Sequence, residues 1–162
     1  MKPLVIGVAL FVFAARPFVP SPILFGALFV VGIAWPTVAA RRMSVVGPFS
    51  IGLACLAVGR LFGRSPGFPL RPSYLALVVV AAVAEEAFFR RLVYATLEPG
   101  GAALATLGSA SLFAAAHVTV YGFWVLPLDL AAGLVLSWQR WATGTWTVPA
   151  ATHVLANLMV VL

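Results

Sequence analysis

The chain alternates between long apolar runs and short segments that contain prolines, glycines or cations. Each apolar run is close to the roughly 20 residues that a helix needs to cross the hydrocarbon of a bilayer. The breakers between them mark turns. We therefore predict six or seven membrane helices, the first of them weak because Arg16 interrupts it. The predicted ranges are 3–19, 22–40, 44–61, 74–97, 102–120, 121–138 and 145–162.

Composition supports a membrane protein. Apolar residues make up 63% of the chain and charged residues 9%, whereas a soluble domain carries about 25% charge. The predicted fold is all-α, a polytopic transmembrane helix bundle. A Pro- and Gly-rich stretch at 63–72 is the clearest linker. It divides N-terminal transmembrane helices and linker (1–72) from a C-terminal four-helix core (73–162), and both parts belong to one compact bundle.

The net charge of +6 comes from ten basic residues, most of them near the ends of apolar runs. Such cations mark topology and contact phospholipid. Six fall on one side of the predicted membrane, with Arg140 placed in the connection between the last two helices, and four on the other. No basic face is clustered enough to bind nucleic acid. We predict a multi-pass protein of the cell membrane, with the lipid bilayer as a partner and no nucleic acid.

Charged side chains interrupt the fourth apolar run, where they are costly unless they face a bundle interior or a wet cavity. Glu85 and Glu86 follow an apolar stretch, and Arg90 comes four residues after Glu86. The acid-first spacing of Glu86 and Arg90 favours an ion pair on a helix, whereas Glu85 projects about 100° away. We predict Glu85 as a general base with the Glu86–Arg90 pair as support. The alternative is two carboxylates that are salt-bridged only for packing.

Two histidines lie in later apolar runs. His117 lies one turn after Phe113 and His153 one turn before Asn157, so each pair shares a helix face. A single histidine in an apolar helix commonly makes only an interhelical hydrogen bond, but depth favours a shared site here. At 1.5 Å per residue from the connections on one side, Glu85 lies roughly 20 Å deep and His117 roughly 24 Å. His153 and Asn157 lie roughly 12 and 18 Å deep, so we predict one water-filled cavity suited to hydrolysis.

Asp129 lies at a similar depth in the sixth run, about 16 Å from the helix end near Arg140. Its side chain could line the cavity, anchor a histidine or pair with an arginine. The sequence does not decide among these, and Asp129 is included as a candidate pocket residue.

Three segments taken in order resemble the CPBP family, which includes the CAAX-processing proteases and the bacteriocin-processing membrane proteins. They are Glu85-Glu86-Ala-Phe-Phe-Arg90, Phe113-Ala-Ala-Ala-His117 and His153-Val-Leu-Ala-Asn157. The family pattern is Glu-Glu-x-x-x-Arg, then Phe-x-x-x-His, then His-x-x-x-Asn or a similar residue. Each motif alone is weak, but three in order on separate apolar helices are specific. The resemblance covers about 74–162, and the first 70 residues match only as generic membrane helices.

The resemblance implies an intramembrane endopeptidase of the glutamic type, which hydrolyses a peptide bond of a membrane-associated protein or peptide. It implies that Glu85 activates water and that His117 helps to position it. His153 and Asn157 would stabilise the oxyanion that forms when water attacks the peptide carbonyl. Supporting residues on this interpretation are Glu86, Arg90 and Phe113.

No metal or other cofactor is expected, and zinc is the alternative. The family has also been described as metal-dependent, and Glu85, His117 and His153 could supply three ligands with water as the fourth. We favour the metal-free mechanism because a zinc triad commonly places two histidines on one helix at close spacing. Here each histidine has a helix of its own.

The expected substrate is a membrane-anchored or prenylated protein or peptide. The short chain is typical of sorting-type proteases that process C-terminal anchors, and a zinc-dependent CAAX-type protease is an alternative. A non-enzymatic membrane immunity or binding module is a second class, although such a module has no need to keep Glu85, both histidines and Asn157. A proton-coupled transporter is a third class, but the paired repeats with broken helices that favour it are not visible.

Overall fold

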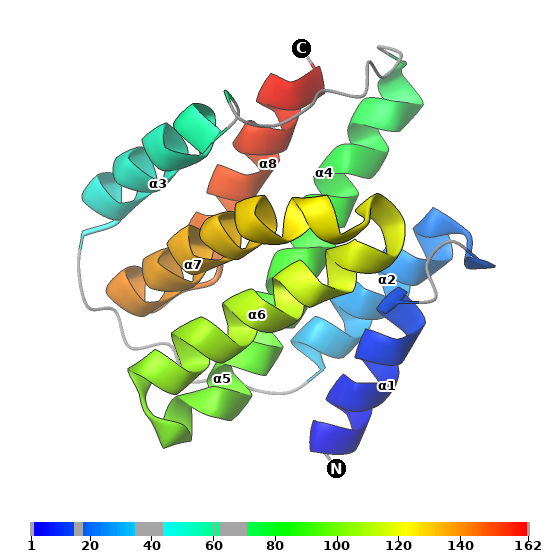
Figure 1. Cartoon of the computed structure of the whole chain (residues 1–162), viewed down its shortest axis with the longest axis horizontal. Helices are drawn as coiled ribbons and strands as arrows, with labels where there is room; N and C mark the ends of the chain where they lie inside the picture. Colours follow the sequence, from blue (N-terminus) through cyan, green and yellow to red (C-terminus); the bar gives the residue numbers. More distant parts are fainter. Residues whose placement is uncertain (1, 15–17, 35–43, 60, 62–70, 162) are drawn as a thin grey trace.

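The computed structural model describes residues 2–14, 18–34, 44–59, 61 and 71–161, and every regular element in these ranges is helical (Figure 1). This confirms the predicted all-α fold. Arg16 and most of the predicted linker at 63–72 lie outside the described residues. The predicted boundary between 1–72 and 73–162 falls at the first residues of α4, and this division stays a prediction.

Each predicted range overlaps at least one helical element of the structure. In the first half these are α1 (Lys2–Ala14), α2 (Ser21–Ile33) and α3 (Val46–Gly59). A continuous rod then runs through α4 (Pro72–Glu86), the π-helix η3 (Ala87–Val93), α5 (Tyr94–Leu97) and the 3₁₀ turn η4 (Glu98–Gly100). It is followed by α6 (Ala102–Tyr121), the 3₁₀ turn η5 (Phe123–Val125), α7 (Leu126–Thr143) and α8 (Thr147–Val161). We refer to Pro72–Gly100 as the α4 rod.

The sixth predicted helix is wrong in its bounds. The sequence suggested 121–138, whereas α7 begins and ends five residues later. Gly122 stops α6 because it adopts a φ of 83°, which L side chains rarely take. Apolar residues of the 3₁₀ turn then precede Pro127, which opens the first turn of α7. Arg140 consequently lies within α7 and is buried, with 4% of its surface exposed; its placement in a connection was wrong.

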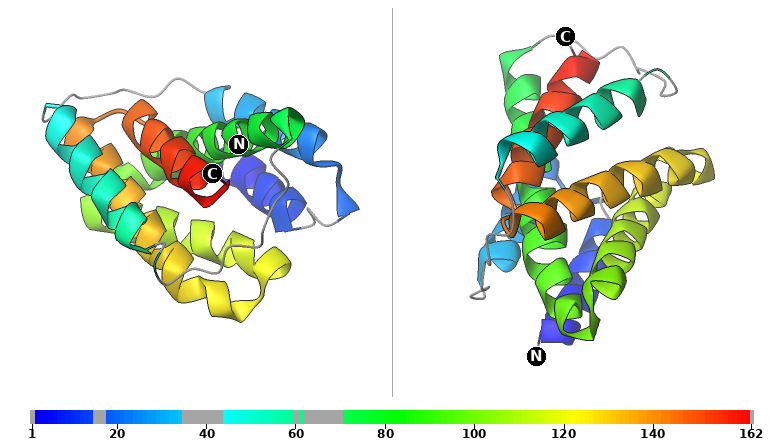
Figure 2. Two further views of the ribbon diagram at one scale, coloured as in Figure 1. Left: turned by 90° about the horizontal axis from the view of Figure 1, so that it is seen from above. Right: turned by 90° about the vertical axis from the view of Figure 1, so that its left-hand side faces the viewer.

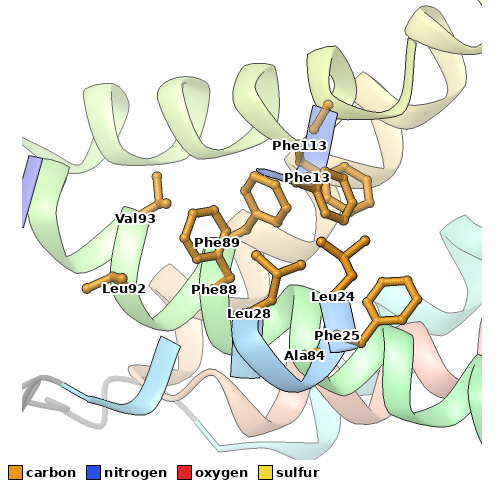
Figure 3. Close-up of a cluster of buried hydrophobic side chains, with 11 residues drawn as sticks. Phe13, Leu24, Phe25, Leu28, Ala84, Phe88, Phe89, Leu92, Val93 and Phe113 are labelled. Carbon is orange, nitrogen blue, oxygen red and sulfur yellow. The ribbon is translucent and has the colours of Figure 1, made fainter. Parts of the chain in front are cut away.

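The α4 rod is the element on which the others are assembled. It contacts α2 on one side and α8 on the other, while α6 and α7 pack together as an antiparallel pair (Figures 1 and 2). Gly32 of α2 lies so close that a Cβ there would come within 2.6 Å of the Ala87 backbone. Aromatic rings from three elements, Phe13, Phe89 and Phe113, pack in the same buried cluster (Figure 3). This cluster covers one side of the ionisable residues of the rod.

Two helices in the described part of the chain are long and apolar enough to cross a membrane, namely Pro72–Gly100 and Ala102–Tyr121. Ser21–Ile33 and Val46–Gly59 are shorter apolar helices. Large apolar side chains, such as Phe11 and Ile23, are exposed on α1 and α2. An exposed apolar surface of this kind suits contact with lipid.

Candidate active site

The α4 rod changes from α- to π-helical geometry directly after Glu86. The Tyr94 N–H donates to the carbonyl of Phe89, five residues back, whereas an α-helix would direct it to Arg90. Segments of π-helix are rare and occur frequently at functional sites. Two other helices supply donors to this segment: Ser109 Oγ donates to the Phe89 carbonyl at 2.9 Å, and Arg140 Nε donates to the Arg90 carbonyl at 3.2 Å.

Glu86 is at the centre of a buried polar chain. Its Oε1 accepts a hydrogen bond from Arg90 Nη1 at 3.0 Å, and neither side chain is exposed. The same oxygen lies 2.9 Å from Nδ1 of His153 on α8. Arg90 also donates through Nη2 to the Gly133 carbonyl of α7 at 3.3 Å. The ion pair suggested by the sequence is therefore present, and it extends to a histidine 67 residues away.

Glu85 faces both histidines. Its Oε1 lies 3.8 Å from Nε2 of His117, and its Oε2 lies 4.0 Å from Nε2 of His153. These separations exceed the roughly 3.2 Å limit of a direct N–H···O hydrogen bond, and they suit groups that are bridged by water. The carboxylate is buried, with 5% of the residue exposed. One carboxylate thus meets imidazoles from two other helices.

The second nitrogen of each imidazole fixes its orientation. His117 Nδ1 lies 2.8 Å from the Phe113 carbonyl, and a carbonyl oxygen can only accept, so Nδ1 carries the proton. His153 Nδ1 donates in the same way to the Glu86 carboxylate. In a neutral imidazole the other nitrogen is then an acceptor. Neutral His117 therefore presents the lone pair of Nε2 toward Glu85, so a water between them can donate to it, whereas Nε2 of His153 accepts when the ring is neutral and donates when it is protonated.

Phe113 forms an apolar wall of this cluster. Its ring centroid lies 4.3 Å from the Arg90 guanidinium carbon, 4.5 Å from the His117 ring and 5.9 Å from the His153 ring. The guanidinium over the ring is a cation–π contact. The Tyr121 ring stacks parallel to the His117 ring, with centroids 6.0 Å apart and an interplanar angle of 7°. These rings restrict the orientation of both histidines.

Two further residues suggested by the sequence lie at the edge of the cluster. Asp129 Oδ2 lies 3.8 Å from His117 Nδ1, which places it beside a histidine. Asn157 lies one turn beyond His153 on α8 and is half-buried. In the ranges that the structure describes, no hydrogen bond of the Asn157 side chain is found. The structure therefore brings Glu85, Glu86, His117 and His153 together, with Asn157 near them only through its helix.

Sequence reasoning missed three buried polar residues that join the helices, and only two of them contact the π-helix. They are Ser109 and Arg140, which donate to the π-helix, and Gln139, whose Nε2 donates to the Pro48 carbonyl at 2.8 Å and to Thr152 Oγ1 at 2.9 Å. A signal existed for Arg140, because a cation within an apolar helix is itself a functional hypothesis. The misplaced helix boundary hid that signal. Ser109 carries no comparable signal, since serine is common in membrane helices.

A zinc ion would require Glu85, His117 and His153 to converge on one point. Among the residues that the structure describes, no group of three or more His, Cys, Asp or Glu side chains is arranged to hold a metal ion. We therefore derive no step through a metal, and metal dependence is left to the experiment described below.

The candidate site residues, from Glu85 to Asn157, lie within one region of family similarity. A family model described as type II CAAX prenyl endopeptidase, Rce1-like, matches residues 68–159. The chain belongs to this family. The match includes the whole α4 rod, α6, α7 and both histidines, and it agrees with the resemblance drawn from the three motifs. Membership in the Rce1-like family makes the chain a peptidase of a membrane-embedded class. No curated protein and no solved structure matches the chain.

Proposed function

We propose that this Rce1-like protein is a multi-pass intramembrane endopeptidase of the glutamic type, in which Glu85 activates the attacking water. The observation that supports this most directly is the position of the Glu85 carboxylate, whose two oxygens lie 3.8 and 4.0 Å from Nε2 of His117 and His153. A water in this space donates one hydrogen to Glu85 and the other to His117. That geometry directs the water's lone pair toward a substrate carbonyl.

The reaction follows from these positions. Glu85 takes a proton from the water as its oxygen bonds to the peptide carbonyl carbon. The carbonyl oxygen becomes an oxyanion, which accepts hydrogen bonds from Asn157 and from a His153 that carries protons on both nitrogens. When the C–N bond breaks, Glu85 returns its proton to the leaving amine. Glu86 keeps the His153 ring in place through Nδ1 throughout, and no metal takes part.

The substrate class follows from the family rather than from the site. CAAX endopeptidases of this family act on prenylated CAAX-type proteins in membranes, so we propose a prenylated C-terminal peptide as the substrate. Sorting-type processing of a C-terminal anchor is the alternative. A site enclosed by helices that suit a bilayer favours a membrane-anchored substrate in either case.

The test is cleavage of a farnesylated CAAX peptide by the purified protein in lipid nanodiscs. Glu85→Gln should reduce kcat by about 10²- to 10⁴-fold, the range of general-base catalysis, and His117→Ala and His153→Ala should also be strongly impaired. Thr119→Ala changes an exposed residue on the same helix as His117 and should keep the wild-type rate. Wild-type cleavage by Glu85→Gln would refute the proposed base. A peptide with a non-prenylated transmembrane anchor, assayed in parallel, separates the two substrate classes.

Metal dependence is tested in the same assay. The proposed mechanism predicts that a strong chelator leaves the rate unchanged. Loss of cleavage after chelation that added Zn²⁺ restores would overturn the metal-free mechanism and favour Glu85, His117 and His153 as ligands.

A further inference from the structure

Arg140 of α7 is a buried cation that contacts the α4 rod beside the Glu85 cluster. Its side chain meets the α4 rod at three residues that are spaced four apart. Nε donates to the Arg90 carbonyl at 3.2 Å, the guanidinium lies 5.2 Å from the Tyr94 ring centroid, and Nη2 lies 3.8 Å from Glu98 Oε2. Residues spaced by four lie along one face of a helix. Arg140 therefore follows the rod over two turns.

The contact with the Arg90 carbonyl has a specific cause. In an α-helix this carbonyl would accept the N–H of Tyr94, but here the Tyr94 N–H donates to Phe89. The change of register thus removes the ordinary α-helical donor at a buried position. Arg140 Nε supplies a charge-assisted donor to this carbonyl in place of the Tyr94 N–H. Arg140 therefore favours the π-helical over the α-helical register at Arg90.

Helix α7 also contacts the guanidinium end of the Arg90 side chain. The Arg90 guanidinium donates to the Gly133 carbonyl, and Gly133 lies two turns before Arg140 on α7. At Gly133, α7 packs tightly against α6, because glycine has no side chain; a Cβ there would lie only 3.0 Å from the Ala110 Cα. The backbone and the side chain of Arg90 are thus both positioned from α7, and the side chain in turn fixes Glu86.

We propose that Arg140 is a positioning residue for the peptidase reaction: it stabilises the π-helical register at Arg90 and so aims the Arg90–Glu86 pair at His153. This inference rests on the proposed function, because it assigns His153 a part in the reaction. Arg140 itself touches neither the substrate nor the reacting water. Its effect passes through Arg90 to Glu86, and from Glu86 to the His153 ring.

A purely structural role makes a different prediction. If Arg140 only joined α7 to the rod, its replacement would lower stability and the amount of folded protein, while folded molecules would keep their rate and their His153 hydrogen bond. A positioning role requires that folded molecules change both in their rate of cleavage and in the His153 hydrogen bond. Gln139 gives a matched control, because it is the neighbouring buried polar residue and joins α7 to α3 and α8 through Pro48 and Thr152.

The experiment compares Arg140→Met, Arg140→Lys and Gln139→Met in nanodiscs with the farnesylated CAAX peptide. The chain contains only two histidines, so ¹⁵N-histidine labelling gives a simple spectrum that His117→Ala assigns. Arg140→Met should lower kcat at least about tenfold with little change in KM, as expected for a misplaced catalytic group. It should also shift the His153 Nδ1 resonance, with Arg140→Lys intermediate. Gln139→Met should lower thermal stability but keep kcat and the His153 resonance.

Ser109→Ala is the second route, should Arg140→Met fail to fold. It removes the donor to the neighbouring Phe89 carbonyl with a small change in volume, and it should shift the same resonance in the same direction. Arg140→Lys and Ser109→Ala proteins with wild-type kcat and an unshifted His153 would overturn the positioning role. The spectrum requires no cleavage, so a failure of the proposed function, seen as full activity in Glu85→Gln, is recognised separately from a failure of this inference.

Discussion

We expect replacement of Arg90 by methionine to destabilise the protein far more than the same change at its neighbour Arg91. Arg90 is fully buried and forms the ion pair with Glu86. Methionine keeps the length of the side chain but removes the charge. Glu86 would then remain buried with only His153 as a hydrogen-bonding partner at Oε1. Arg91 is half-buried, and its Nη1 donates to the Gly32 carbonyl at 2.6 Å.

The expected magnitude follows from these contacts. Removing one partner of a buried ion pair costs about 3–5 kcal/mol, and part of this arises from the lost cation–π contact with Phe113. This is a large share of the roughly 5–15 kcal/mol of a typical folded domain. At about 2–4 °C per kcal/mol for a chain of this size, the midpoint of unfolding should fall by ~6–20 °C. Arg91→Met loses one partly exposed hydrogen bond, about 1–2 kcal/mol.

The assay is thermal unfolding in one detergent, followed by circular dichroism and by the monodisperse fraction on size exclusion. The double variant Glu86→Gln/Arg90→Met should recover part of the loss, because the amide leaves no uncompensated charge. Equal midpoints for Arg90→Met and Arg91→Met would refute the reasoning. So would a double variant that is simply the sum of its two single changes.

Three further predictions concern packing and the edge of the site. Gly32→Ala should destabilise the protein by about 1–3 kcal/mol in thermal unfolding, because the added Cβ would overlap the π-helical backbone. The control Gly26→Ala, on the same helix, places its Cβ in open space and should be neutral or slightly stabilising. Phe113→Leu should lower kcat more than it lowers the unfolding midpoint, since the ring restricts His117; a change confined to stability would contradict this. Asp129→Asn should reduce kcat several-fold if its carboxylate orients His117, and an unchanged rate would remove Asp129 from the site.

The sequence allowed a prediction that Glu85, Glu86, His117 and His153 lie close together, because each of them interrupts an apolar run. Glu86 and Arg90 carried a spacing that favours an ion pair, and that pair is present. Depth along the helices placed Glu85 near both histidines. The contact between Glu86 and His153 was not predicted, because one carboxylate oxygen accepts two donors here and the second comes from a distant helix.

The π-helix and the contacts of Arg140 could not be predicted in the same way. No residue pattern marks the change of register after Glu86, which depends on donors that Ser109 and Arg140 bring from α6 and α7. The bounds of α7 were misjudged because residues on either side of Gly122 are equally apolar. Hydropathy records burial but not where a helix ends, and that error moved a buried arginine into a connection.

The bond between Glu86 and His153 also bears on how the enzyme is made. A ribosome synthesises the α4 rod well before α8, so the nascent rod carries three acids and two arginines without either imidazole. On the proposed mechanism, the site lacks His153 and Asn157 until α8 is synthesised, so a growing chain would not cut other newly inserted proteins beside it. On the same mechanism, activity therefore begins only once α8 has packed against the rod, so the protease is inactive during the earlier part of its own synthesis.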